Sequence, residues 1–99
     1  MRILQQNCKM HIFICTNQRE KTKGMPCCAD VHGQEIYDEI KNYVKQEGLT
    51  DIVWVTRTRC LGFCNAQGAT IVIYPQKIWL TEVVREDIAK IKMIINDYK

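Results

Sequence analysis

The stretch from Gln34 to Gly48, QEIYDEIKNYVKQEG, decides the fold because it predicts a helix between two segments that have the composition of strands. Ile36, Ile40 and Val44 repeat at intervals of four residues, which is the spacing of one apolar face of a helix. Gly48 is suited to end this helix, because glycine readily adopts the left-handed backbone conformation found after many helices. We therefore predict an amphipathic helix over this stretch.

Segments rich in β-branched and aromatic residues lie on both sides of the helix and predict strands. The predicted strands are Lys9–Cys15, Asp51–Thr58, Thr70–Tyr74 and Lys77–Leu80, and a second helix is predicted over Arg85–Asp97. The third strand is apolar throughout, which indicates a central strand buried on both faces. Trp54, Tyr74 and Trp79 lie on these strands, and we expect them in the core.

The order strand, helix, strand, strand, strand, helix predicts an α/β fold with a mixed four-stranded sheet. A strand–helix–strand unit normally forms a right-handed crossover between parallel strands, so the first two strands should be parallel. The short turn at Pro75 and Gln76 should join the last two strands into an antiparallel hairpin. This architecture is compatible with a thioredoxin-like domain. With 99 residues, we expect a single domain over residues 1–99, in which residues 1–9 form a short N-terminal extension.

Composition and charge exclude several classes of function. The net charge of +3 is small, and a basic patch interleaved with aromatic residues, typical of nucleic-acid binding, is absent from the sequence. No apolar run is long enough to cross a membrane. Residues 1–10 are largely polar and lack the apolar centre of a signal peptide. We therefore expect a cytoplasmic protein that binds neither nucleic acid nor membranes.

Six cysteines in 99 residues are the unusual feature of the sequence. Three disulfides are not expected, because the cytoplasm keeps thiols reduced. Cys15 ends the first predicted strand, Cys27 and Cys28 lie in the Thr16–Val31 loop, and Cys60 and Cys64 lie in the Arg59–Gly68 loop. The carboxyl ends of parallel strands meet at one edge of a sheet, so these five thiols should lie close together. Cys8 precedes the first strand, and we interpret it as an incidental thiol.

Four thiolates can hold either a tetrahedral zinc ion or a 2Fe-2S cluster. Cys60 and Cys64 form one compact pair, whereas the other two ligands would be widely separated in sequence, which favours the wider cluster. Zinc in a structural or interaction module remains an alternative. Thiol–disulfide chemistry at Cys27 and Cys28 is a weaker one, because the usual Cys-x-x-Cys motif is missing.

The arginines and histidines of the sequence allow more than one interpretation. Arg57 and Arg59 could offset the negative charge of a cluster or bind an acidic partner. A role as ordinary solvated side chains is equally compatible with the sequence. His11 and His32 belong to no Cys-x-His pair, so we do not expect them to be Rieske-type ligands.

Several motifs together resemble the thioredoxin-like 2Fe-2S ferredoxins, a family that includes the ferredoxin-like domain of the small flavoprotein-partner subunit of respiratory NADH dehydrogenase. They are IFICTNQR at 12–19, Gly24 with Cys27-Cys28-Ala29, TRTRCLGFC at 56–64, IVIYP at 71–75, and Trp79. The resemblance extends over residues 10–98. It departs from the family pattern at Glu20–Lys23, at Gly68-Ala69 and at Leu80–Glu82, and none of these departures removes a ligand.

The resemblance implies a cofactor, a ligand set and a role. It implies one 2Fe-2S cluster per chain, held by Cys15, Cys28, Cys60 and Cys64. Cys27 is a possible substitute for Cys28, because a long loop can shift by one residue at low cost. It implies a one-electron carrier rather than an enzyme, which exchanges electrons with a partner oxidoreductase. It also implies a homodimer.

Overall fold

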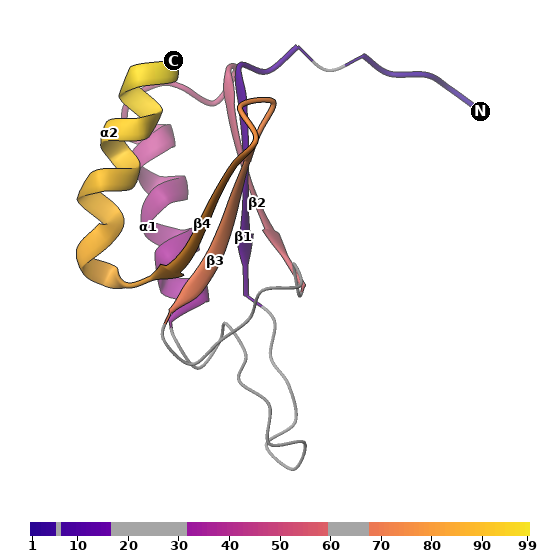
Figure 1. The fold of residues 1–99 in the computed structure, drawn as a ribbon. Coiled ribbons are helices and arrows are strands. Elements are labelled where there is room, and N and C mark those ends of the chain that lie inside the picture. The colour runs from indigo at the N-terminus through magenta and orange to yellow at the C-terminus, as the bar shows by residue number, and fades with distance from the viewer. Residues whose placement is uncertain (6, 17–31, 60–67) are drawn as a thin grey trace.

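A computed structural model describes residues 1–5, 7–16, 32–59 and 68–99. In these residues the fold consists of one sheet and two helices that cover one of its faces (Figure 1). The elements are β1 (Met10–Cys15), α1 (Gly33–Gln46), β2 (Val53–Thr58), β3 (Ala69–Tyr74), β4 (Ile78–Val83), the 3₁₀ turn η2 (Arg85–Asp87) and α2 (Ile88–Tyr98). Every predicted strand and helix is confirmed, and most bounds shift by one or two residues. The Thr16–Val31 and Arg59–Gly68 loops lie almost entirely outside the described residues.

The four strands lie in the order β2-β1-β3-β4. β1 and β2 are parallel, whereas β3 is antiparallel to both β1 and β4. The predicted parallel pair, the predicted hairpin and the mixed sheet are therefore confirmed. β4 is longer than predicted, because it continues past Leu80 to Val83 through an irregularity in its pairing with β3.

The end of α1 has a hydrogen-bond pattern and a backbone conformation that favour glycine at position 48. The N–H of Gly48 donates to the carbonyl of Lys45 at 3.1 Å, and the N–H of Leu49 donates to the carbonyl of Val44 at 2.9 Å. Gly48 has a φ of 67°, in the region that L side chains avoid. These two bonds satisfy carbonyls that the helix end leaves unpaired. The chain then turns back toward β2, with Leu49 buried in the core.

The core lies between the sheet and the two helices, which cover the same face of the sheet (Figure 1). Its fully buried side chains include Ile12, Ile14, Ile36, Ile40, Ile71, Ile73 and Ile95. β3 has a neighbouring strand on each side and is buried except at Tyr74. The prediction of a central, buried third strand is therefore confirmed apart from its last residue.

The expectation that three aromatic residues lie in the core is wrong. Trp54, Tyr74 and Trp79 leave 40%, 38% and 43% of their surfaces exposed. Successive side chains of a strand point to opposite faces of the sheet. These residues face away from the helices, and no element of the described chain covers that face (Figure 1). We call it the open face below.

The C-terminal helix is joined to α1 as well as to the sheet. Asp87 accepts a hydrogen bond at Oδ2 from the backbone N–H of Val84, at 3.0 Å, where η2 begins. Tyr43 of α1 donates its hydroxyl hydrogen to Oδ1 of Asn96 at 3.0 Å.

Neither helix of the described residues has the length and apolar character needed to cross a membrane.

Candidate functional site

The carboxyl ends of β1 and β2 meet at one edge of the sheet. Cys15, the last residue of β1, is paired with Thr58, the last residue of β2. The N–H of Thr16 donates to the carbonyl of Thr58 at 2.9 Å, so the backbones of β1 and β2 remain side by side just beyond the end of β1. Cys60 follows Thr58 by two residues in the sequence. This edge therefore holds Cys15 and the end of the strand that leads to Cys60.

Cys15 is completely buried, with 0% of its surface exposed. It shares a strand face with His11 and Phe13, both of which remain partly exposed. The edge of the sheet is thus covered at Cys15 although the open face is not covered farther along β1. Cysteine sulfur is a soft ligand that suits iron and zinc. Shielding it from water also tunes the properties of a metal site, because the surrounding shell controls solvent access.

Two of the six cysteines, Cys8 and Cys15, lie in the described residues. Cys8 is half-buried and stands at the opposite end of β1 from Cys15. The predicted ligands Cys28, Cys60 and Cys64, together with Cys27, lie outside the described residues, so the four-cysteine ligand set stays a prediction. Among the residues that the structure does describe, no three His, Cys, Asp or Glu side chains converge on a position for a metal ion.

Gly68 marks the point where the second cysteine loop returns to the sheet. A Cβ atom at this position would overlap the backbone of Glu82 and Val83 in β4. Glu82 has a φ of 58°, next to the pairing irregularity between Ala69 and Ile71. The loop that carries Cys60 and Cys64 therefore joins β3 at a position where only glycine fits. Close approach of two strands, rather than an unusual φ, imposes this requirement.

Polar and charged side chains hold the start of α1. His32, which precedes the helix, has a φ of 66°, and its Nδ1 lies 3.4 Å from Oε1 of Glu35. Glu35 also forms an ion pair with Arg85 of η2. These contacts connect the segment after Cys28 to the C-terminal part of the chain. They give His32 a structural role at the start of the helix.

His11 makes contacts that the sequence did not predict. Its Nε2 is hydrogen-bonded to Oγ1 of Thr56 on the neighbouring strand, at 2.7 Å. Its ring stacks on Phe13 at 4.0 Å between centroids and lies edge-on to Trp54 at 5.7 Å. Burial by these neighbours lowers the pKa of His11 below its usual value. The alternation of His11 with Phe13 along β1 was the only signal in the sequence that the two rings share a face.

Arg57 and Arg59 are both exposed. They lie at the end of β2 and just beyond it, one on each side of Thr58. None of the ion pairs in the described part of the chain involves either residue. Their positive charges are therefore available next to the edge of the sheet that carries Cys15.

Comparisons with known proteins identify relatives of similar sequence and a solved structure of similar fold. No family model matches the chain. A 2Fe-2S ferredoxin from Clostridium pasteurianum is 33% identical over 85 residues, which cover 86% of this chain and 82% of that protein. A 2Fe-2S ferredoxin from Aquifex aeolicus (strain VF5) is 26% identical over 82 residues, covering 82% and 73% of the two chains. The crystal structure of the thioredoxin-like [2Fe-2S] ferredoxin from Aquifex aeolicus matches with a TM-score of 0.76 at 25% identity, over 85% of this chain and 82% of that one.

Proposed function

The chain belongs to the thioredoxin-like 2Fe-2S ferredoxins, and we propose that it carries one electron at a time on a single 2Fe-2S cluster held by Cys15, Cys28, Cys60 and Cys64. Ferredoxins are electron carriers rather than enzymes, so the chain converts no substrate of its own. A partner oxidoreductase supplies the electron or accepts it.

The observation that carries the ligand proposal is the pairing of Cys15 with Thr58. It brings the first ligand to the end of the strand that precedes Cys60, although the two cysteines are 45 positions apart in the sequence. The thiol of Cys15 is shielded from water, and thiolate sulfur is the donor that iron–sulfur clusters use. When bound, the cluster takes up and releases a single electron. The chain itself supplies the thiolates, excludes water from Cys15 and holds the two strand ends together.

Metal and sulfide analysis tests this proposal. Protein purified without oxygen should contain about two iron and two sulfide ions per chain, which is the content of a 2Fe-2S site. Dithionite should bleach its visible absorption and produce a low-temperature EPR signal from one unpaired electron. Stoichiometric zinc without sulfide would instead identify the chain as a zinc-binding module.

We also propose that two copies of the chain associate through the open face. Two rows of cross-strand neighbours cross it, and they consist of Trp54, His11 and Tyr74 in one row and Thr56, Phe13, Val72 and Trp79 in the other. Neither row contains Lys, Arg, Asp or Glu. In a two-fold interface the same surface meets itself, so an uncharged aromatic face can pair without bringing like charges together. Exposed apolar patches of this kind commonly mark interaction sites.

The remaining features of the proposal concern location and chain organisation. We place the carrier and its partner oxidoreductase in the cytoplasm, where cysteine ligands stay reduced. We regard residues 1–99 as one thioredoxin-like ferredoxin domain, in which residues 1–9 are a short N-terminal extension.

A further inference from the structure

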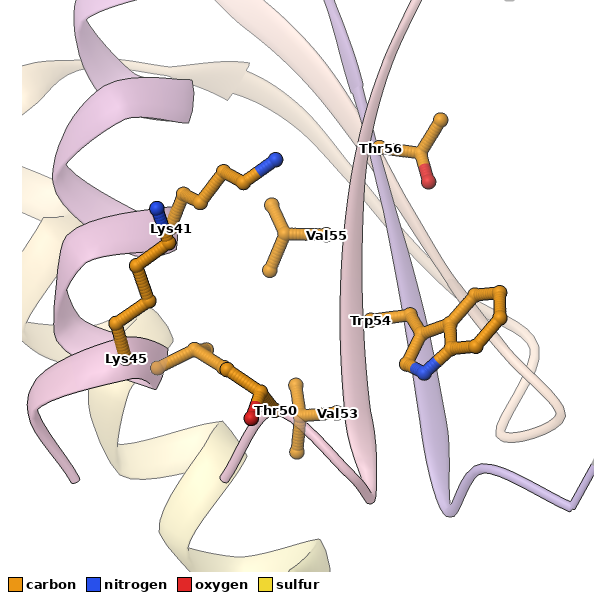
Figure 2. Close-up of a pocket in the computed structure, with 8 residues that line it drawn as sticks. Lys41, Lys45, Thr50, Val53, Trp54, Val55 and Thr56 are labelled. Atoms are coloured by element: carbon orange, nitrogen blue, oxygen red, sulfur yellow. The ribbon is translucent and has the colours of Figure 1, made fainter. Parts of the chain in front are cut away.

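A cavity of about 200 Å³ lies between α1 and the outer edge of β2 (Figure 2). Four consecutive residues of β2, from Val53 to Thr56, line it together with residues of α1 and Thr50. Consecutive side chains of a strand point to opposite faces of the sheet. A cavity that touches all four must therefore run along the edge of the strand, where backbone N–H and C=O groups point outward. We call this cavity the β2 groove.

The outer edge of β2 is a free position in the described sheet. β2 is the first strand in the order β2-β1-β3-β4, and among the described strands it pairs only with β1. Unpaired backbone groups on an edge strand can accept an added strand from another chain. Val53, Trp54, Val55 and Thr56 also belong to the residue types that favour strands.

The β2 groove is basic. Lys41 and Lys45, one helical turn apart on α1, extend along it (Figure 2), and Arg57 and Arg59 continue beyond it toward the end of β2. None of the residues that line the groove is acidic. In the part of the chain that the structure describes, these four cations take part in no ion pair. Lys41 instead donates a hydrogen bond to the hydroxyl of Tyr37 at 2.8 Å.

Lysines near a sheet edge often protect it from unwanted strand addition. Such protection normally places the charge on the edge strand itself. Here Lys41 and Lys45 stand on the helix beside the strand, and the strand presents valine, tryptophan and threonine along the groove. Arg57, near the end of β2, is the one charged residue on the strand itself. This arrangement leaves the backbone of β2 accessible and adds a charge that selects the incoming segment.

We infer that the β2 groove docks an extended acidic segment of the redox partner, which adds to β2 as a further strand. Its carboxylates pair with Lys41, Lys45 and Arg57, and attraction between opposite charges speeds the encounter. The inference rests on the proposed electron-carrier function. β2 ends at Thr58, beside Cys15, so a partner docked along β2 lies next to the edge of the sheet where the cluster is proposed.

A fluorescently labelled peptide with blocked ends, Glu-Val-Glu-Thr-Glu-Val-Glu, is the probe for this surface. Fluorescence anisotropy should show saturable binding to the cluster-loaded protein that weakens with added salt. The Lys41→Glu/Lys45→Glu variant should bind about tenfold or more weakly, because two attractive charges become repulsive. The Lys90→Glu/Lys92→Glu variant carries the same net charge on α2, away from the groove, and should bind as the wild type does. A peptide N-methylated at every backbone amide keeps its charge but has no N–H to donate from either edge, so it cannot pair as a strand and should lose binding.

Visible absorption and EPR spectra of each variant separate this inference from the proposed function. A wild-type protein that holds no cluster contradicts the proposed function itself. The docking inference is overturned if the cluster is present and the acidic peptide fails to bind. It is equally overturned if the α2 variant weakens binding as much as the groove variant does, or if the N-methylated peptide binds as well as the unmodified one.

Discussion

Single residues determine which sulfur atoms can reach a common centre. Cys15 is held by the last pair of the parallel strands and has no freedom to change register, because a shift by one residue would turn it to the other face. Cys27 and Cys28 are adjacent in the sequence and follow Pro26. Adjacent residues of an extended chain point in roughly opposite directions. Only one of the two is therefore expected to bind a cluster that Cys15 also binds.

Serine substitutions distinguish these two cysteines. Cys28→Ser should give little or no cluster, or a shifted spectrum where serine oxygen or Cys27 substitutes. Cys27→Ser and Cys8→Ser should keep near-native absorption and EPR spectra, while serine at Cys15, Cys60 or Cys64 should abolish or destabilise the cluster. Iron and sulfide content per chain, measured after anaerobic purification, checks each variant.

The double variant Cys27→Ser/Cys28→Ser is the control for substitution between neighbours. A long loop can move by one residue at small cost, so partial rescue of Cys28→Ser by Cys27 is expected to disappear in the double variant. A cluster lost from Cys27→Ser but retained by Cys28→Ser would show that the assigned ligand is wrong by one position.

His11 predicts a pH dependence of stability. Burial by Phe13 and Trp54 lowers its pKa in the folded chain, whereas the unfolded chain should titrate near pH 6.5. The unfolded state therefore binds the proton more tightly, and protonation favours unfolding. The contribution of His11 is complete above about pH 6.5 and is lost as the pH falls through its folded-state pKa. No carboxylate lies in the two rows of the open face to offset this charge.

Chemical denaturation between about pH 5.5 and pH 7.5 measures this effect within the range where histidine titrates. The free energy of unfolding of the wild type should fall toward the acidic end. His11→Phe keeps an aromatic ring beside Phe13 but cannot be protonated, so its stability should change less over the same range. Equal pH dependence of the two proteins would assign the effect to other groups.

At the scale of elements, two glycines have different physical roles. Glycine is favoured at position 48 by the backbone conformation, because φ is positive there. Steric overlap is not the reason, since the space that a Cβ atom would occupy is empty. Glycine is needed at position 68 because it has no side chain, and any Cβ atom there would overlap the backbone of β4. The first requirement belongs to a single helix end, whereas the second belongs to the contact between two strands.

Alanine substitutions should separate these roles. Gly48→Ala is expected to lower the free energy of unfolding by about 1 kcal/mol, the cost of a left-handed conformation for an L residue. Gly68→Ala is expected to cost about 3 kcal/mol, because the strands must move apart to accommodate the methyl group. Urea denaturation followed by circular dichroism measures both values. Gly48→Ala serves as the matched control, and a smaller loss in Gly68→Ala than in Gly48→Ala would contradict the steric explanation.

At the scale of the whole molecule, both helices pack on one face of the sheet and leave the other open (Figure 1). The exposed tryptophans and tyrosine of that face predict a dimer with about twice the 11.6 kDa mass of the chain. Trp79→Glu should convert the dimer into a monomer, because the two-fold axis would bring the new carboxylates to equivalent positions in an apolar interface. Light scattering at tens of micromolar protein measures the mass.

Met93→Glu is the matched control for the dimer prediction. Met93 is an exposed apolar residue of α2, on the helical side of the sheet, so the variant has the same net charge as Trp79→Glu and should remain dimeric. Far-ultraviolet circular dichroism and the visible spectrum should be unchanged in both variants. A wild-type protein of monomer mass, or a Met93→Glu variant that dissociates as Trp79→Glu does, would reject the open face as the interface.

Local patterns in the sequence were sufficient to predict the elements and their order. The spacing of Ile36, Ile40 and Val44 predicted α1, and the crossover rule predicted the parallel pair of β1 and β2. Both are confirmed. The cysteine motifs led to the family resemblance that the relatives confirm. These inferences succeed because helix periodicity, strand composition and glycine conformation depend on residues that are close in the sequence.

Only the tertiary structure decided which surfaces are covered. Strand alternation shows that Trp54 and Thr56 share a face, but it does not show whether a helix lies over that face. Trp54, Tyr74 and Trp79 were expected in the core and are exposed, because α1 and α2 both pack on the opposite side. The contact of His11 with Thr56 and the position of Lys41 beside the edge of β2 also join residues from separate elements. Burial and contact of this kind depend on how elements distant in the sequence pack together, which local residue patterns do not specify.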